Sequence, residues 1–238
     1  MKLLKSDRKL AILVDPDKWS SVDQMSELVD ALKLANPDFV LVGGSLITND
    51  LFERTIIYLK EQLTIPVFIF PGNGLQVSSK ADGIFLLSLI SGRNPEFLIG
   101  QHVIAAPLIA RSDIEIIPTG YMLIDGGNIT AAAYMSNTQP IPAEKYGIAA
   151  STALAGQQLG MQQIYMDAGS GALNSISNDM IKSVADSTKI PLVVGGGIKS
   201  VKEVQAKWEA GANLVVIGTA IEKNLGLLNE FVTTKEQV

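Results

Sequence analysis

Eight short apolar runs alternate with stretches of helical periodicity, and this alternation narrows the folds open to the chain. The runs are almost continuously apolar, which is typical of parallel strands buried on both faces. Strands that alternate with helices predict βα units with right-handed crossovers, and eight such units predict a (β/α)₈ TIM barrel. The expected strands are 10–14, 39–42, 67–70, 84–87, one within 114–124, 164–166, 192–194 and 214–217. The expected helices are 22–35, 51–63, 95–106, 143–159, 177–186 and 201–210. The 238 residues fit one such domain over 1–238, since these barrels need ~250 residues.

The third βα unit departs from this pattern. Only the segment from Pro71 to Asp82 separates Phe70 from Gly83, and it contains Gly72 and Gly74. A helix of ~11 residues with two connections does not fit there. The sequence therefore predicts a loop in place of the third helix. Such a loop either leaves a thin barrel wall, where a long apolar ligand lies, or is a tight connection without a function.

Composition excludes several classes of protein. Apolar residues make up 47% and charged residues 18% of the chain, enough for a large core and too apolar for a disordered chain. The net charge of -5, without a block of Lys and Arg, gives nucleic-acid binding no support. Cysteine is absent, which excludes disulfides and thiolate sites. No apolar run approaches ~20 residues, and the polar start at Met1–Lys9 is unlike a signal peptide, so we expect a cytoplasmic protein.

The mean hydropathy of +0.27 is high for a soluble enzyme. It predicts extra apolar surface, either in a subunit interface or in a lipophilic pocket. From this apolar character we expect a homo-oligomer with a dimer as its basic unit.

Two glycine-rich turns close the last two apolar runs. Gly195-Gly196-Gly197 follows the seventh run, and Gly218-Thr219 follows the eighth. Glycines let backbone N–H groups approach an anion closely, and the start of the next helix favours negative charge. Their position matches the phosphate-binding corner of a (β/α)₈ barrel and predicts a phosphorylated small-molecule ligand. The alternative is that both are ordinary strand-to-helix turns.

Three other strand ends carry side chains suited to chemistry. Asp15 is a candidate Mg²⁺ ligand because this ion prefers carboxylates together with substrate phosphate oxygens, and Ser45 could join the metal or a phosphate. Both residues would serve equally as turn or capping residues.

The sixth strand ends in Tyr165-Met166-Asp167-Ala168-Gly169-Ser170-Gly171-Ala172, which combines a phenol, a carboxylate and a glycine-rich anion nest. This motif suits a phosphorylated alcohol, with the carboxylate as hydrogen-bond acceptor and base. His102 lies within an expected helix and is interpreted as an ordinary helical residue.

These residues together resemble the geranylgeranylglyceryl phosphate synthase family, specifically its second phylogenetic group, which is related to the heptaprenylglyceryl phosphate synthases. The most distinctive segments are 118–127, 134–142 and 165–172. The resemblance implies a TIM barrel with a loop in place of the third helix. It also implies Mg²⁺-dependent transfer of a geranylgeranyl group from geranylgeranyl diphosphate to the 3-hydroxyl of sn-glycerol 1-phosphate. The product would be an ether-linked precursor of membrane phospholipids, with peripheral access to membrane lipids open to such an enzyme. The resemblance also allows an assembly of dimers.

The resemblance also implies roles for particular residues. Asp15 and Ser45 correspond to the metal ligands. The residues expected to bind glycerol phosphate are Tyr165, Met166, Asp167, Ala168, Gly169, Ser170, Gly171, Gly196, Gly197, Gly218 and Thr219. Asp167 or Tyr165 would take the proton. The family usually has Glu at the position of Asp167, and the shorter carboxylate reaches about one methylene less far. The prenyl tail is expected near Phe68, Phe70 and Leu75.

Two other classes remain open from the residues alone. One is a phosphosugar isomerase or aldolase on the same scaffold, although such mechanisms need an inward lysine or a carboxylate pair at strand ends. The other is a phosphate- or lipid-binding barrel without catalysis. A turnover assay with both expected substrates separates the three.

Overall fold

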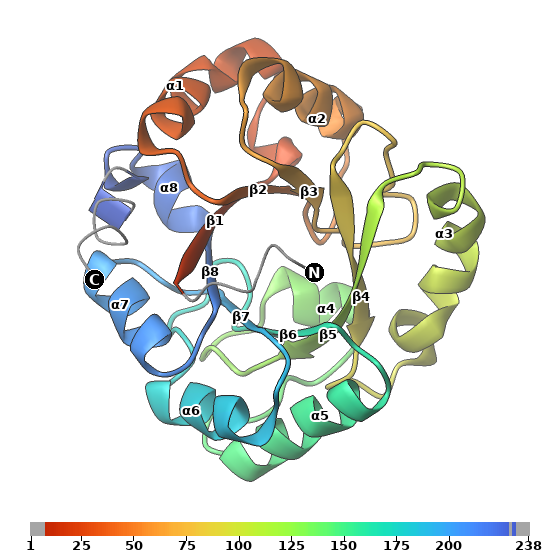
Figure 1. Ribbon diagram of the computed structural model, residues 1–238, viewed down its shortest axis with the longest axis vertical. Coiled ribbons are helices and arrows are strands. Elements are labelled where there is room, and N and C mark those ends of the chain that lie inside the picture. The colour runs from red at the N-terminus through yellow and green to blue at the C-terminus, as the bar shows by residue number, and fades with distance from the viewer. Residues whose placement is uncertain (1–7, 229, 232–238) are drawn as a thin grey trace.

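Eight parallel strands close into a barrel within the residues that the computed structural model describes, 8–228, 230 and 231. Each strand pairs with its neighbours in chain order, and β1 pairs with β8. The strands are β1 (Lys9–Val14), β2 (Phe39–Val42), β3 (Val67–Ile69), β4 (Gly83–Leu89), β5 (Glu115–Leu123), β6 (Gln163–Asp167), β7 (Leu192–Gly195) and β8 (Leu214–Ile217). The predicted (β/α)₈ barrel is confirmed (Figure 1). Residues 1–7 of the expected polar N-terminus lie outside the described residues.

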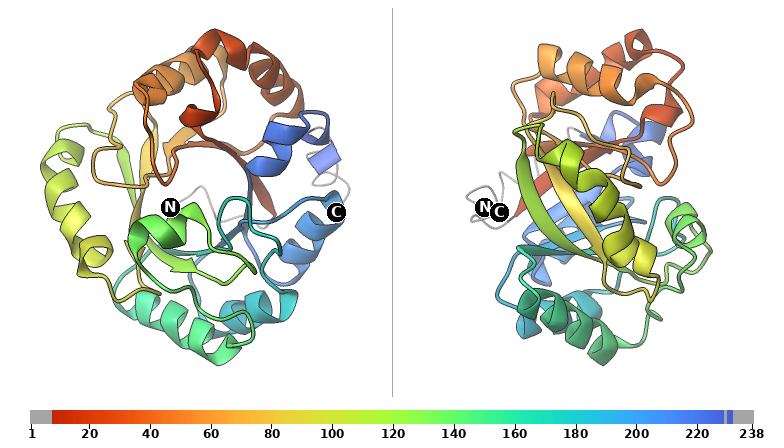
Figure 2. Two further views of the ribbon diagram at one scale, coloured as in Figure 1. Left: turned by 180° about the vertical axis from the view of Figure 1, so that it is seen from behind. Right: turned by 90° about the vertical axis from the view of Figure 1, so that its right-hand side faces the viewer.

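Helices surround the barrel and cover its outer face, except for the short helix Ala131–Ser136, which lies over the mouth of the barrel and packs on the interior cluster (Figure 1 and Figure 2). They are α1 (Ser26–Ala35), α2 (Leu51–Gln62), α3 (Gln101–Ile109), α4 (Ala131–Ser136), α5 (Tyr146–Gln158), α6 (Asn178–Ser187), α7 (Val201–Glu209) and α8 (Thr219–Lys223). Two short 3₁₀ turns, Pro16–Lys18 and Val22–Met25, precede α1, and a π-helical turn, Glu96–Gly100, precedes α3. Across the described ranges, none of these helices combines the length and apolar character that crossing a bilayer requires.

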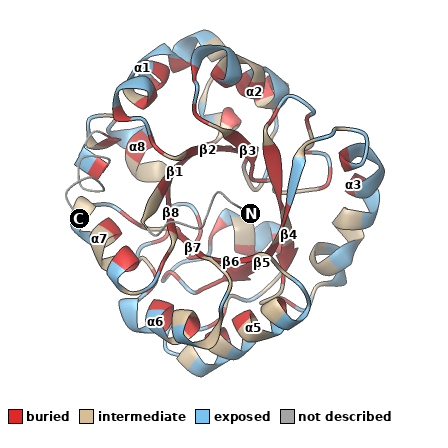
Figure 3. Ribbon diagram, viewed as in Figure 1, coloured by how far each residue is buried: buried red, intermediate tan, exposed pale blue. Residues whose placement is uncertain are grey.

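The strands separate two apolar layers because successive side chains point to opposite faces. One layer lies between strands and helices, with residues such as Ile12, Val42 and Ile164. The other fills the barrel interior, where Phe39, Phe68 and other inward side chains pack together. Figure 3 shows the strands as almost wholly buried and the outward faces of the ring helices as exposed.

No helix follows β3, and every residue between β3 and β4 is described. Figure 1 shows a loop outside the barrel between α2 and α3. Asp82 ends this loop by accepting hydrogen bonds from the Val67 backbone N–H at 2.7 Å and the Lys60 ammonium at 2.6 Å. The predicted replacement of the third helix by a loop is therefore confirmed.

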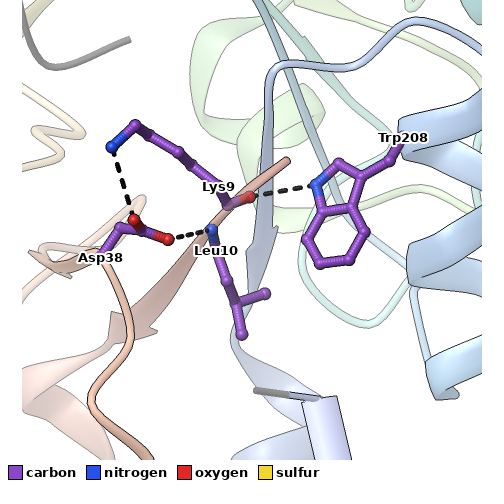
Figure 4. A network of polar contacts seen from close by, with 4 residues as sticks. All are labelled: Lys9, Leu10, Asp38 and Trp208. Carbon is purple, nitrogen blue, oxygen red and sulfur yellow. Dashed lines mark hydrogen bonds and ion pairs between the residues drawn. The ribbon is translucent and has the colours of Figure 1, made fainter. Parts of the chain in front are cut away.

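The amino-terminal end of the barrel is fastened by a polar network (Figure 4). Asp38 accepts a hydrogen bond from the Leu10 backbone N–H at 2.8 Å and lies 3.4 Å from the Lys9 ammonium. The Trp208 indole donates to the Lys9 carbonyl oxygen at 3.1 Å. These bonds join β1 to the segments that precede β2 and β8. The polar groups at this end of the barrel hold the fold together. We therefore expect the functional site at the other end, where the strands have their carboxyl ends.

Candidate active site

The glycine turns after β7 and β8 meet the motif that ends β6. A Cβ added at Gly196, where φ is +83°, would lie 2.5 Å from the Gly169 nitrogen and 2.6 Å from Asp167 Oδ1. The hydroxyl oxygens of Ser170 and Thr219 are 3.1 Å apart, which joins the β6 and β8 loops. The structure thus brings together three segments that the sequence placed at separate strand ends.

The other residues expected to bind the phosphorylated ligand differ in the space around them and in their burial. Gly197, at φ +70°, packs against the Asn174 carbonyl, so that turn is glycine-dependent for conformational reasons. Gly218 is different, because the nearest atoms to an added Cβ would be those of Leu13 at 3.5 Å. Met166 and Ala168 are buried in the outer apolar layer, so only their backbone faces this region.

Asp167 lies in the barrel mouth and is almost fully buried. Its Oδ2 accepts a hydrogen bond from the Tyr121 hydroxyl at 2.6 Å, and its Oδ1 accepts one from the Gly169 backbone N–H at 2.7 Å. Burial raises the pKa of Asp167, while these two hydrogen bonds oppose the rise by favouring the carboxylate. The arrangement is suited to a carboxylate that accepts a proton.

Tyr121 and Tyr165 are buried phenols beside this carboxylate. Burial, reinforced by the charge of Asp167, raises the pKa of each well above its usual value of 10. Both therefore remain protonated, and the Tyr121 hydroxyl donates its hydrogen bond to Asp167. A phenol that already holds its proton cannot take up another as a general base, which leaves Asp167 rather than Tyr165 as the group able to take a proton.

Sequence reasoning missed Tyr121 as a functional candidate. The β5–β6 register places Tyr121 opposite Tyr165 and Leu123 opposite Asp167. The rings of Phe70, Tyr121 and Tyr165 pack together, with centroids 4.9–5.9 Å apart. Alternation along β5 was the available signal, because it places Tyr121 on the same inward face as Thr119.

Asp15 and the turn after β2 adjoin each other at another part of the mouth. A Cβ at Gly44 would lie 2.9 Å from Asp15 Oδ1, so the absence of a side chain there leaves the carboxylate accessible. Asp15 also accepts a hydrogen bond from the Asp17 backbone N–H at 3.0 Å, which is the capping role that the sequence left open. Burial raises the pKa of Asp15.

The residues near Asp15 fit Mg²⁺ better than an ion that needs a full protein cage. Among the described residues, no three His, Cys, Asp or Glu side chains cluster as a metal site. Mg²⁺ commonly takes one or two carboxylates and completes its shell with water and substrate phosphates. One accessible carboxylate beside the Gly44–Ser45 turn is consistent with that donor set.

An apolar groove opens where the third helix is absent. It encloses about 820 Å³, its open mouth included, and runs between the 71–77 loop, β4, α3 and α4. Phe70 and Tyr121 line its end beside Asp167, and Ser45 lines its edge near Asp15. The lining residues further along the groove include Ile84, Leu86, Phe97, Ala105, Ile109 and Met135.

Two expectations about this groove were wrong. Phe68 points into the barrel interior, where it packs against Phe39 and Phe85. Leu75 is 78% exposed and does not line the groove.

His102 is helical, as expected, but it also lines the groove, with Nε2 3.3 Å from the Ser88 hydroxyl. Burial lowers the pKa of His102, which favours the neutral ring.

The closed parallel barrel makes the chain a (β/α)₈ protein, and its paired glycine turns, buried carboxylate and apolar groove lie at one end of that barrel. Its sequence identifies the group more closely. The chain belongs to the PcrB family, whose pattern matches residues 3–235. This confirms the expected family relationship.

Named relatives agree with this membership. The geranylgeranylglyceryl phosphate synthase of Spirosoma linguale is 46% identical over 97% of this chain and 92% of its own length. That of Korarchaeum cryptofilum is 36% identical over 99% and 96%. The crystal structure of the (S)-3-O-geranylgeranylglyceryl phosphate synthase of Thermoplasma acidophilum, in complex with sn-glycerol-1-phosphate, superposes with a TM-score of 0.92. It is 30% identical and covers all of this chain and 96% of that one.

Proposed function

We propose that this chain is a geranylgeranylglyceryl phosphate synthase, which transfers the geranylgeranyl group of geranylgeranyl diphosphate to the 3-hydroxyl of sn-glycerol 1-phosphate. The names of its relatives support this activity, and the Thermoplasma acidophilum complex supports the acceptor. One observation carries the proposal. The apolar groove ends at Tyr121 and Phe70, beside Asp167 and the glycine turns, so a prenyl tail and a phosphorylated alcohol would meet there.

Glycerol phosphate would lie between the β6, β7 and β8 loops. The backbone around Gly196, Gly197 and Gly218 would hold the phosphate, with the hydroxyls of Ser170 and Thr219 as further donors. The backbone of Met166–Gly171 would line the rest of the site. Fixing the phosphate end aims the 3-hydroxyl toward the groove, and this orientation supplies much of the rate gain.

Asp167 is the proposed base, and Tyr165 is a donor to the bound alcohol. As C1 of the donor develops cationic character, its bond to the diphosphate oxygen breaks and a bond to the glycerol 3-oxygen forms. The proton of that hydroxyl passes to Asp167, whose carboxylate is held by Tyr121 and Gly169. The electron pair of the broken C–O bond leaves with the diphosphate, so the reaction needs no further reactant.

The diphosphate would lie at the groove edge near Asp15 and Ser45. Both residues would hold Mg²⁺ there, and the ion would neutralise charge on the leaving group. The carboxylate of Asp15 supplies the negative ligand and the Ser45 hydroxyl a neutral one. The tail would follow the groove, and its affinity would come from burial at about 0.8 kcal/mol per CH₂ under ideal transfer.

A turnover assay tests the proposal directly. Labelled sn-glycerol 1-phosphate and geranylgeranyl diphosphate with Mg²⁺ should give the ether product, and sn-glycerol 3-phosphate should give much less. Conversion of a phosphosugar without any prenyl donor would favour an isomerase or aldolase instead. Tight binding of both substrates without product would indicate a non-catalytic barrel. A cytoplasmic location with peripheral access to membrane lipids stays a prediction.

A further inference from the structure

Gln76 is a buried polar residue in the loop that replaces the third helix. It is 4% exposed, and both the oxygen and the nitrogen of its side-chain amide form hydrogen bonds. Its Nε2 donates to the Gly44 carbonyl oxygen at 2.9 Å, and its Oε1 accepts from the Gly72 backbone N–H at 3.0 Å. The side chain therefore joins two segments that are separate in sequence, the 71–77 loop and the turn after β2.

The same two segments are also in direct backbone contact. A Cβ at Gly72 would collide with the Gly44 carbonyl oxygen and lie 2.8 Å from Ser45 Cα. The loop thus packs closely on Gly44 and Ser45, with Gln76 bonded across the contact. Any displacement of one segment must either carry the other with it or break the Gln76 hydrogen bonds.

The two segments also share the groove. Pro71, Gly72 and Val77 line it from the loop, while Gly44 and Ser45 line its edge. In the proposed function the tail touches the loop and the diphosphate touches the turn. Gln76 is the side chain that bridges these two contact regions.

We propose that Gln76 is a positioning residue that sets the Gly44–Ser45 turn for the Mg²⁺-diphosphate end of the donor and couples that end to the groove loop. The inference rests on the proposed function for the place of the diphosphate. The Gln76 amide contacts neither substrate and acts through Ser45. Without its donor, the Gly44 carbonyl loses its partner and the turn loses its fixed position against Asp15.

The chain offers a matched control in Gln101 of α3. Its Oε1 accepts from the Gly74 backbone N–H at 2.6 Å, and its Nε2 donates to Glu96 at 2.5 Å. Gln101 thus also makes two side-chain hydrogen bonds, one of which anchors the same loop, but to α3 instead of the metal-side turn. Gln76→Met and Gln101→Met remove equivalent groups from the two sides of one loop.

Calorimetric binding of inorganic diphosphate with Mg²⁺ tests the inference without turnover. Gln76→Met should raise the Kd for diphosphate by about tenfold, the cost of one lost hydrogen bond in a positioned site. Gln101→Met should stay within about twofold of the unsubstituted protein. The Kd for sn-glycerol 1-phosphate should be unchanged in both. Equal weakening by the two variants, or none by Gln76→Met, overturns the inference.

Hydrogen exchange on the unsubstituted protein gives a second test that does not depend on a variant folding. Diphosphate with Mg²⁺ should slow exchange in 72–77 as well as in 43–46, because Gln76 joins them. Slowing confined to 43–46 overturns the inference. If the protein catalyses prenyl transfer but the exchange of 72–77 and of 43–46 responds independently, only the proposed coupling is rejected. Coupled segments without transfer would instead reject the proposed function.

Discussion

At the residue scale, the Tyr121–Asp167 hydrogen bond should control the pH dependence of the reaction. Burial raises the pKa of Asp167, and the bond from Tyr121 lowers it. Tyr121→Phe removes a lowering contribution, so the pKa should rise. A base works only as the carboxylate, and activity is lost as pH falls through its pKa. The acid limb of kcat against pH should therefore move to higher pH in this variant.

The control for this shift is Tyr165→Phe. Tyr165 is not among the causes that set the pKa of Asp167, so its loss should lower kcat without moving the acid limb. Profiles of kcat measured from pH 5 to 9 for both variants check the difference. An unmoved limb in Tyr121→Phe would exclude Asp167 as the group that titrates.

Gly218 offers a residue-scale test of phosphate binding that is separate from folding. An added Cβ would meet Leu13 at an ordinary contact distance of 3.5 Å, and φ at Gly218 is −124°. The space around Gly218 therefore admits a Cβ that a bound anion would meet, although its ψ of −84° lies outside the main allowed regions and costs some stability in any other residue. Gly218→Val should raise the KM for glycerol phosphate by about tenfold, as for one lost hydrogen bond, with a smaller loss of Tm than in Gly196→Ala.

Gly196→Ala is the contrasting variant. Its positive φ and its contacts with Gly169 and Asp167 predict a lower Tm together with lost activity. Thermal unfolding and steady-state kinetics on both proteins separate the two effects. Normal kinetics in Gly218→Val would mean that the phosphate binds elsewhere.

At the element scale, α3 forms one wall of the groove and should set the depth available to the tail. This helix runs opposite to the strands, so Phe97, His102, Ala105 and Ile109 line the groove at increasing depth. Ala105 is small and buried, and Ala105→Phe should fill the deep part. The KM for the C20 donor should rise by at least tenfold, since each displaced CH₂ forfeits up to about 0.8 kcal/mol, and that for a C10 donor should rise less.

Ala155→Phe on α5 provides the control, because Ala155 is exposed, does not line the groove and lies outside α3. It should leave both constants near those of the unsubstituted protein. Equal losses for the two donor lengths in Ala105→Phe would place the tail outside this groove.

Comparison at this scale also shows what the sequence could predict. The strands and the absent helix were predictable because burial pattern and segment length are local properties. Tyr121 was missed because its bond to Asp167 depends on the pairing register of β5 and β6. Phe68 was misplaced because a continuously apolar strand does not reveal which of its side chains face inward. The short helix α4 was missed because its six residues are too few for a periodic signal.

At the scale of the whole molecule, α3 also presents an apolar outer surface. Ile99, Val103, Ile104 and Leu108 are 42–66% exposed, and Ile116 of β5 is 41% exposed. From Phe97 to Ala110 the chain carries no Asp, Glu, Lys or Arg. Contiguous apolar surface of this kind marks interfaces, so we place the predicted homo-oligomer contact on α3.

Ile104→Glu should therefore convert the oligomer to a monomer, because the substitution would bury a charge in an apolar contact. Leu34→Glu on α1 is the control, since Leu34 is 75% exposed and lies outside this surface. Light scattering at micromolar concentration measures the change, and a monomeric unsubstituted protein would contradict the prediction.

Within α3 itself only Ala105 and Ile109 are buried, so a partner copy would help to hold this groove wall in place. Ile104→Glu should consequently raise the KM for the prenyl donor while leaving that for glycerol phosphate unchanged.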